Sequence, residues 1–363
     1  MTFSSKVVLA LLPAMILTGC STAPTESATP TPAAHTVCLV ADSRGLLDGG
    51  VNESAYSALK EAVVSLGVAK LQTVLHAKSG PASIYQSVNQ MIRRGCEVVV
   101  ATGSQVRGAV VRAARANPDI SFVLVDDEVP TATPHPLANN LKHLMFDAGQ
   151  SAILAGYLAA ANSKTGLVAT FGSTDTPSVR ASMQGFSAGV QLYNADADAD
   201  VVVLGAGGVW KDWTFLGSAT DVSKAKSQSK LFFDDGADVI YPVAGKASLG
   251  AGLATRGQLD KFVIGADRDW FMDADNKAWR SQVLASTVKQ VSRPVLEAIK
   301  AFVNDASVGD PASNEYIGTL ANGGVSLTEE RAVPFAPQFD SARGRLISGI
   351  NSGDITTPKG TNN

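Results

Sequence analysis

The feature that most constrains the fold of this chain is a repeated alternation between apolar, β-branched runs and segments with helical periodicity. Continuous apolar strands separated by helices are typical of a parallel sheet that is covered on both faces. The expected strands are 37–41, 71–75, 98–101 and 122–125 in a first series, and 167–171, 201–204, 239–243 and 262–264 in a second. The expected helices are 54–65, 84–94, 106–116, 149–161, 179–192 and 223–233. The sequence therefore predicts an α/β fold with two lobes, each a parallel sheet flanked by helices.

Length and charge support this division and narrow the range of partners. The chain has 363 residues, which is more than one small hydrophobic core usually serves. An apolar content of 45% excludes a disordered or fibrous chain. The 30 Lys and Arg residues against 33 Asp and Glu residues give a net charge of -3, whereas nucleic acid favours a strong positive excess. We therefore expect a folded protein that does not bind nucleic acid.

The N-terminal segment is expected to direct the chain rather than to fold. Lys6 precedes an apolar run that is too short to remain as a membrane-spanning helix, which is typical of a secretory signal. The sequence Leu-Thr-Gly-Cys that ends at Cys20 resembles the bacterial lipobox, in which the Cys becomes the first mature residue and carries the lipid. An ordinary export signal with an incidental Cys is the alternative. We expect residues 1–19 to be a lipoprotein signal peptide and residues 20–34, rich in Ser, Thr, Ala and Pro, to be a flexible tether to the extracytoplasmic face of the cell membrane.

The other two cysteines are close to expected strands. Cys38 lies in the run 37–41 and Cys96 directly precedes the run 98–101. If these strands are neighbours, the two side chains lie at corresponding depths, and outside the cytoplasm such a pair is free to oxidise. We expect a disulfide between Cys38 and Cys96, with two buried free thiols as the alternative.

Polar and small residues follow most of the expected strands. In an open parallel sheet, ligands bind beyond the carboxyl ends of the strands. The residues found there are Asp42, Thr102, Gly103, Asp126, Asp127, Gly172, Asp175, Gly245 and Asp267. A single Asp at a strand end is commonly a helix cap or a turn residue. Several together form a polar rim that suits a neutral, hydroxylated ligand better than a phosphate, whose charge they repel.

Motifs for catalysis and for metal binding are absent from the sequence. It contains no phosphate-binding loop, no nucleophile-elbow pattern and no pair of His residues at zinc spacing. Residues 194–200, expected to be an exposed loop, match the opening of a calcium loop, but Val201 stands where that loop requires Gly. A hydrolase that uses Asp267 and Asp269 as an acid and base pair is a weaker alternative. We expect a protein that is not an enzyme and that has no cofactor or metal.

A series of short motifs runs through the expected folded part. The motifs are 40–42 with 47–53, 100–103, 125–127, 155–158, 174–177 with 184–190, 236–240 with 244–250, 264–269, 286–291 and 348–358. In this order they resemble the basic membrane protein (BMP) family of bacterial lipoproteins, which includes purine nucleoside-binding receptors of ABC transporters. The resemblance implies a type I periplasmic binding protein fold with three crossovers between the lobes, and it makes 286–291 the start of a helix. It implies an N-terminal lobe of residues 35–146 and 267–321, and a C-terminal lobe of residues 147–266 and 322–358.

Six residues match positions where that family lines its binding cleft. They are Asp42, Asn52, Asp126, Gly245, Asp267 and Lys289. The resemblance implies that Asn52 and Asp126 pair with the polar edges of a base. Asp267 and Lys289 suit ribose hydroxyls, as acceptor and donor respectively. The alternative for Lys289 is a surface charge at a helix start.

The aromatic rings that sandwich the purine in that family are replaced here. Val51 and Ala219 occupy the two positions. A stacked ring contributes on the order of 1 kcal/mol beyond its burial, so losing both rings weakens purine selectivity unless others replace them. The candidate replacements are Trp210, Trp213, Phe215, Tyr56 and Trp270. The alternative for each of these rings is packing in the core or in a loop.

The resemblance implies a lipid-anchored, extracytoplasmic solute-binding protein of an ABC transporter. Such a protein closes its two lobes over a small ligand, here a nucleoside, and delivers it to a membrane permease driven by a separate ATPase. We expect it to act as a monomer. The alternatives are a membrane-anchored sensor without a transport role, a receptor for a sugar-like or other small polar solute, and a nucleoside-processing enzyme.

Overall fold

The computed structural model describes residues 1–2, 35–42, 45–76, 81–127, 138–207, 212–304 and 314–360. The chain forms two units, Met1–Ala33 and Ala34–Asn363, and the helices and strands of the described residues all lie in the second. The expected signal peptide, the expected tether and the expected lipidation site Cys20 fall outside the described residues, apart from residues 1–2. In the part of the chain that the structure describes, no helix combines the length and the apolar character needed to cross a membrane.

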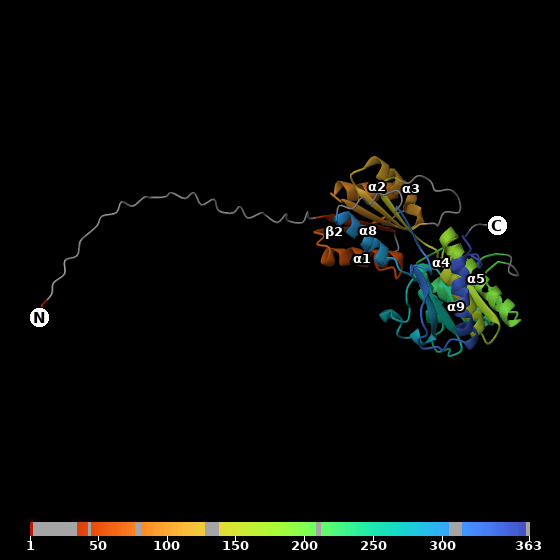
Figure 1. Cartoon of the computed structure of the whole chain (residues 1–363). Coiled ribbons are helices and arrows are strands. Elements are labelled where there is room, and N and C mark those ends of the chain that lie inside the picture. Colours follow the sequence, from red (N-terminus) through yellow and green to blue (C-terminus); the bar gives the residue numbers. More distant parts are fainter. Residues whose placement is uncertain are drawn as a thin grey trace. The chain divides into compact units, whose positions relative to one another are not determined.

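The first sheet has six strands, and each neighbouring pair in it is parallel. In order across the sheet, the strands are β11 (Glu315–Gly318), β5 (Leu141–Phe146), β4 (Ser121–Asp127), β3 (Val98–Thr102), β1 (Thr36–Asp42) and β2 (Lys70–His76). The helices around it are α1 (Val51–Ser65), α2 (Pro81–Arg93), α3 (Arg107–Ala116) and α8 (Ser292–Val303), with a short 3-10 helix η1 (Ser104–Val106) before α3. α1 and α8 cover one face of the sheet, and α2 and α3 cover the other (Figure 1).

The side chains of β1 show why this sheet is covered on both faces. Val37 and Leu39 pack in the cluster that contains α1 and α8, whereas Cys38 and Val40 pack in the cluster that contains α2 and α3. Successive side chains of a strand point to opposite faces, so an unbroken apolar run needs a helical layer on each side. The expected parallel sheet with helices on both faces is confirmed for this lobe.

The second sheet also has six strands. In order across the sheet, they are β12 (Val325–Leu327), β10 (Val283–Lys289), β9 (Phe262–Gly265), β8 (Val239–Val243), β6 (Leu167–Gly172) and β7 (Val202–Leu204). The pairs are parallel except for β12, which runs antiparallel to β10. α4 (Ala148–Asn162), α5 (Pro177–Ala197) and α9 (Pro337–Ser352) share one core cluster, while α6 (Val222–Asp234) and α7 (Leu249–Ala254) share the other. Three short 3-10 helices lie in its loops: η2 (Gly245–Ser248), η3 (Ala274–Asn276) and η4 (Arg280–Gln282).

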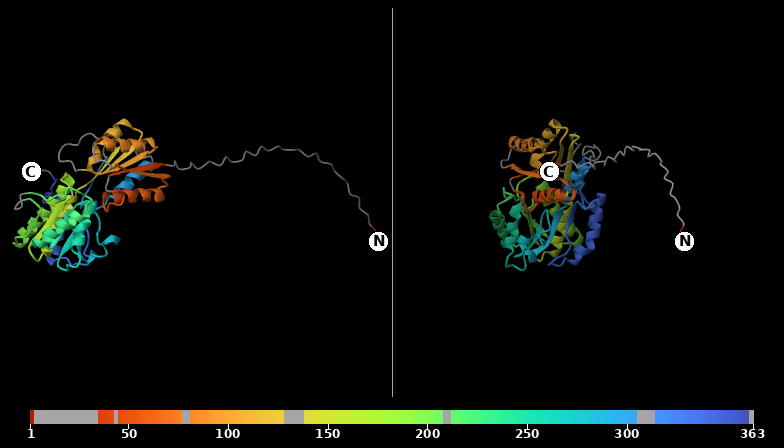
Figure 2. Two further views of the ribbon diagram at one scale, coloured as in Figure 1. Left: turned by 180° about the vertical axis from the view of Figure 1, so that it is seen from behind. Right: turned by 90° about the vertical axis from the view of Figure 1, so that its left-hand side faces the viewer.

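The chain passes between the two sheets three times. It leaves the first sheet after β5 through α4, returns from β10 through α8 to β11, and leaves again between β11 and β12. The two sheets are separate in both views of Figure 2. The chain was expected to re-enter the first lobe at residue 267. It does so only after Lys289, because β10 pairs with β9 in the second sheet. The expected two-lobed α/β fold with three crossovers is confirmed.

The disulfide is formed between Cys38 in β1 and Cys96 just before β3. β1 and β3 are parallel neighbours, and the two Cα atoms are 5.9 Å apart. Both residues are buried in the same core cluster. The expected disulfide is confirmed, and it links two cysteines that are 58 residues apart along the chain.

Candidate functional site

Three of the predicted site residues meet where strands of the two sheets end. Asp126 lies at the end of β4 in the first sheet, Asp267 follows β9 in the second sheet, and Lys289 is the last residue of β10. Asp126 and Asp267 have left-handed backbones, with φ values of 59° and 70°. Asp adopts this region more readily than most residues with a side chain, because its short polar group can bond locally. The left-handed backbone of Asp126 coincides with a shift of register between β4 and β5, so the regular pairing of these two strands is interrupted at Asp126.

Lys289 connects the two lobes through its ammonium group. Its Nζ lies 2.9 Å from Oδ1 of Asp126 in the first lobe and 3.2 Å from Oδ1 of Asp267 in the second. Its backbone N–H donates to the carbonyl of Asp267 at 3.1 Å, which fixes these two residues relative to each other. The Lys289 side chain is only 8% exposed, so the alternative of a surface charge is wrong. The expected helix start at 286–291 is also wrong, because residues up to Lys289 belong to β10 and α8 begins at Ser292.

The charges in this cluster determine what it can bind. Burial by itself lowers the pKa of Lys289, but the charges of Asp126 and Asp267 and the hydrogen bonds to them outweigh burial and hold this pKa above its ordinary value. Lys289 therefore remains a cation between two carboxylates, and the cluster carries a net negative charge. Carboxylate oxygens accept hydrogen bonds only, so the cluster favours ligands with hydroxyl or N–H donors and repels anions.

A second ion pair joins the lobes next to Asp267. Nη1 of Arg268 lies 3.4 Å from Oε2 of Glu53 on α1, and Nη2 of the same side chain contacts Asp273 in its own lobe. Gly49 leaves the room for this guanidinium, since a Cβ at Gly49 would lie 2.6 Å from Nη2. The Gly49 N–H donates to Oε2 of Glu53 at 2.9 Å, which holds the carboxylate at the start of α1. The sequence motifs gave no signal for this pair.

The other three predicted residues have different roles in the structure. Asp42 ends β1, and its side chain lies outside the described residues. Asn52 is fully buried, its Nδ2 donates to the carbonyl of Gly45 at 3.0 Å, and its Oδ1 accepts from the Thr102 hydroxyl at 2.5 Å. This amide therefore ties the loop before α1 to the end of β3. Gly245 follows β8, next to β9, and begins η2 with a positive φ of 56°.

Two of the candidate aromatic rings lie beside an arginine of the second lobe. The Arg180 guanidinium binds Asp175 through hydrogen bonds of 2.9 and 2.5 Å. It lies 5.8 Å from the centre of the Trp213 ring and 5.3 Å from that of Phe215. Both rings are half-buried, and Phe215 bridges to Gly172 at the end of β6. These rings therefore lie at the edge of the second sheet where its strands end, but both already contact the Arg180 guanidinium.

The remaining aromatic candidates pack within a lobe or lie outside the described residues. Trp270 is 3% exposed and meets Trp279 edge to face at 5.6 Å, so it is a core residue. Tyr56 is half-buried beneath Lys60, whose Nζ is 4.8 Å from the ring centre. Trp210 falls in a segment that is not described.

Two chemical alternatives do not fit the structure. Asp267 and Asp269 bind different cations, since Asp269 Oδ2 lies 2.9 Å from Nη2 of Arg331, so they do not form an acid and base pair. The expected loop at 194–200 is wrong over its first part, because α5 continues through Ala197, and Asp196 accepts a hydrogen bond from the Tyr157 hydroxyl at 3.0 Å. Among the described residues, no group of three or more His, Cys, Asp or Glu side chains is placed to hold a metal.

Comparison with known proteins assigns the chain to a family. The family model for the ABC transporter substrate-binding protein PnrA-like family, Bmp, matches residues 35–345. The chain is 26% identical over 333 residues to the ABC transporter nucleoside-binding protein BmpA of Lactococcus lactis, covering 88% of each protein. It is 27% identical over 248 residues to basic membrane protein A of Borreliella burgdorferi, covering 68% of this chain and 66% of that one.

The fold agrees with solved structures of the same type of protein. A solute-binding protein of an ABC transporter system from Aeropyrum pernix superposes with a TM-score of 0.70 at 22% identity, over 90% of this chain and 94% of that one. A second solute-binding protein, from Conexibacter woesei, gives a TM-score of 0.65 at 20% identity, over 91% of this chain and 100% of that one. This likeness supports the type I periplasmic binding fold with two lobes. The chain therefore belongs to the Bmp family, whose members are PnrA-like substrate-binding proteins of ABC transporters and not enzymes.

Proposed function

We propose that this substrate-binding protein binds a nucleoside between its two lobes, at the cluster of Asp126, Asp267 and Lys289. The observation that carries the proposal is that Lys289 bridges carboxylates of both lobes at the carboxyl ends of their strands. A ligand in this place touches both lobes at once. The relative from Lactococcus lactis is named a nucleoside-binding protein, which supports the same ligand class.

The chemistry of the cluster favours a nucleoside over its phosphate ester. Asp126 and Asp267 supply acceptors for ribose hydroxyls or base N–H groups, and Lys289 supplies a donor. The net negative charge disfavours a phosphate in the same place. In this proposal Asn52 positions the loop before α1, while Asp42 and Gly245 contribute from the ends of β1 and β8.

Closure of the lobes follows from contacts on both sides. A ligand shifts an open and closed equilibrium only by its difference in affinity for the two states. A nucleoside held by Asp126 in one lobe and by Asp267 and Lys289 in the other makes its full set of contacts only when the lobes are together. The closed protein then presents the ligand to the permease, whose transport is driven by a separate ATPase.

Thermal unfolding of the unit Ala34–Asn363 with a panel of small molecules tests the ligand class. A nucleoside at a hundred times its Kd adds about 2.7 kcal/mol of stability, which for a protein of this size raises Tm by about 4 °C. Asp267→Asn, which keeps a residue that tolerates the left-handed backbone, removes the shift. Asp260→Asn, at an exposed position before β9, keeps it.

Sugars are the second ligand class, and a specific observation favours them. Val51, at one of the two family ring positions, is buried at 2% exposure in the first lobe, so it offers no ring to a base. Free ribose and related sugars therefore belong in the same panel. A response to sugars together with no response to nucleosides overturns the proposed ligand.

Anchoring and transport are tested in cells. Radioactive fatty acid is expected to label the full chain and not a Cys20→Ser variant; labelling of both variants, or of neither, contradicts the lipid anchor.

Loss of the gene is expected to reduce nucleoside uptake, and the full chain to restore it. Binding without any effect on uptake supports a sensor instead.

Sedimentation of the unit Ala34–Asn363 is expected to show a monomer.

A further inference from the structure

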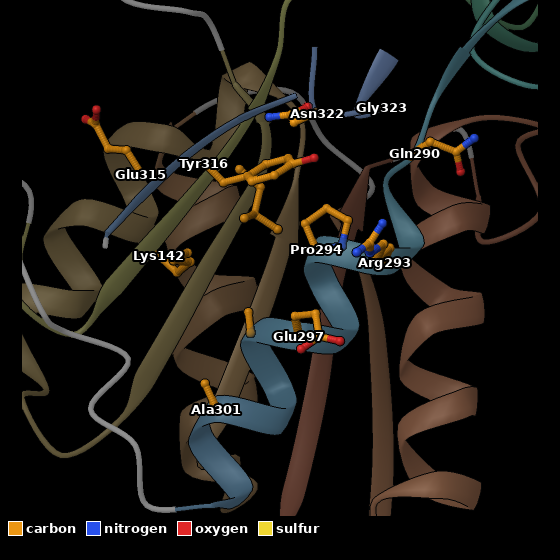
Figure 3. Close-up of a pocket in the computed structure, with 12 residues that line it drawn as sticks. Lys142, Gln290, Arg293, Pro294, Glu297, Ala301, Glu315, Tyr316, Asn322 and Gly323 are labelled. Carbon is orange, nitrogen blue, oxygen red and sulfur yellow. The ribbon is translucent and has the colours of Figure 1, made fainter. Parts of the chain in front are cut away.

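A cavity lies on the first lobe, and none of the six predicted site residues lines it. It has a volume of about 610 Å³, and it lies between α8 and the strands β5 and β11 (Figure 3). Its floor is apolar: the buried residues Leu144, Pro294 and Ala298 line it together with the half-buried Tyr316. Tyr316 is held in place by an edge-to-face contact with Phe146, at 6.0 Å between ring centres. A cavity of this size with a mostly apolar floor is typical of a small-molecule site.

Several polar side chains at the rim of this cavity make no hydrogen bond or ion pair with the described residues. The side chains of Gln290, Arg293, Glu297 and Glu315 line it and are exposed, and within the described residues none of the four makes a hydrogen bond or ion pair. Lys142 adds a second cation to the lining, and burial lowers its pKa. Two cations therefore stand against two carboxylates, and the cavity has no excess of either charge.

The cavity is bordered by two of the three connections between the lobes. Gln290 and Arg293 belong to the return from β10 to β11, and Asn322 and Gly323 belong to the passage from β11 to β12. The backbone N–H of Gln290 donates to the carbonyl of Gly324 at 2.9 Å, so the two connections are also bonded to each other here. In a two-lobed protein, closure is absorbed by such connecting segments. A molecule that fills this cavity touches both of them.

We propose that this cavity is a second ligand site, for a neutral, flat heteroaromatic molecule, and that its occupation shifts the equilibrium between open and closed lobes. The apolar floor and the Tyr316 ring accept a flat ring system, the balanced charges favour a neutral one, and the unused groups of the rim bind polar atoms at its edge. Only the effect on the lobes rests on the proposed function, because binding to the cavity is independent of what the other site holds. Two sites that bias one equilibrium are coupled in both directions.

Fluorine NMR with 5-fluoroindole, a neutral heteroaromatic probe, tests the site. The unaltered unit Ala34–Asn363 is expected to shift and broaden the probe resonance in a saturable way. Ala301→Phe fills the cavity and is expected to abolish this effect, whereas Lys300→Phe, on the exposed side of the same helix, is expected to retain it. No saturable binding, or equal binding by both variants, overturns the site.

Crystals of the unaltered unit soaked in 5-fluoroindole provide a second readout that does not depend on a variant folding. Density for the probe is expected against Tyr316 and Pro294. Density only at other places overturns the site even if the NMR signal responds.

Small-angle X-ray scattering tests the effect on the lobes. Saturation with 5-fluoroindole is expected to change the radius of gyration of the unaltered unit and of Lys300→Phe, but not of Ala301→Phe. If the probe binds in the cavity and the scattering of the unaltered unit is unchanged, the coupling is overturned and the site remains. The result does not depend on nucleosides, so it separates this inference from the proposed function.

Discussion

At the scale of single residues, Lys289 is the group on which the candidate site depends. Its ammonium group is buried and is balanced by one carboxylate from each lobe. Removing one partner of a buried charge pair leaves the other charges without compensation, which costs more than the pair contributes. Here the two Asp partners are less buried than Lys289, so water can solvate their carboxylates and reduces that cost.

Lys289→Met is expected to lower the free energy of unfolding by about 2–4 kcal/mol, because Asp126 and Asp267 then face each other without a cation. Urea denaturation of the unit Ala34–Asn363 measures this loss. Lys246→Met is the matched control at an exposed position and is expected to change stability by less than about 0.5 kcal/mol. Equal effects of the two substitutions contradict the role of Lys289.

The stability contributed by Lys289 has a defined dependence on pH. Its pKa is raised in the folded protein, so the unfolded chain releases this proton first as the pH rises. The contribution is complete below the unfolded value of 10.5 and is lost above it. The difference between the unaltered chain and Lys289→Met is therefore expected to be constant from about pH 7 to pH 9. A difference that falls steadily within this range contradicts the raised pKa.

Sequence reasoning reached some of these residues and not others, for physical reasons. Asp126 and Asp267 follow apolar strands, so the rule that ligands bind at carboxyl ends was enough to find them. Lys289 was identified only through the family resemblance, because the run before it contains Ala, Ser and Thr and does not show a strand. Glu53 and Arg268 are 215 residues apart and meet only after folding, so no local pattern marks them.

At the scale of elements, the start of α1 and the loop after β9 form a contact between the lobes. The Glu53 and Arg268 side chains are about a third exposed, at 34% and 28%, so their pairing contributes modestly to stability. Its position across the two lobes gives it more effect on their equilibrium than on unfolding.

Arg268→Ala is expected to weaken ligand binding by up to about fivefold, equivalent to roughly 1 kcal/mol. The reason is that the substitution removes a contact between the lobes that is made only in the closed state. Titration calorimetry with the ligand found in the panel measures the change. Arg256→Ala, at an exposed position after α7, is the control and is expected to leave affinity unchanged. Identical affinities for the two variants rule out a contribution of this pair to closure.

The helices α4 and α5 pack closely against each other. Gly156 permits this close packing, because a Cβ there would lie 1.9 Å from the carbonyl oxygen of Phe186. Gly156→Ala is therefore expected to lower Tm, with a loss of about 1–3 kcal/mol. Gly108→Ala, in α3 with open space around it, is expected to be neutral or stabilising by up to about 1 kcal/mol. A stabilising Gly156→Ala would show that the two helices are not in this close contact.

Unbroken apolar strands could be predicted even when short, as β7 was from the run 201–204, whereas strands interrupted by polar residues could not. β5 contains Lys142 and His143, and β11 and β12 are only four and three residues long. A strand of three or four residues that also contains a polar residue, such as β11 or β12, shows no clear period, and its identity depends on the neighbour with which it pairs. The start of α8 was expected too early, at 286–291, because the residues up to Lys289 pair in β10 and the helix begins only at Ser292.

At the scale of the whole molecule, the three crossovers place the strand ends of both sheets in contact through Lys289. The family resemblance predicted this arrangement, and the strand alternation alone predicted two lobes without saying how they are connected. The charge of the site is a property of the assembled molecule, since it sums one carboxylate from the first lobe with a carboxylate and a lysine from the second. Under the proposed function, that sum favours a nucleoside over a nucleotide.

Titration calorimetry of the unit Ala34–Asn363 with a nucleoside and with its 5′-monophosphate tests this account most directly. The account predicts saturable binding of the nucleoside, and binding of the monophosphate that is weaker by about tenfold or more, equivalent to roughly 1.4 kcal/mol. Asp267→Asn is expected to lose nucleoside binding. Equal or tighter binding of the monophosphate, or nucleoside binding that Asp267→Asn leaves unchanged, would contradict the assignment of this cluster as the ligand site.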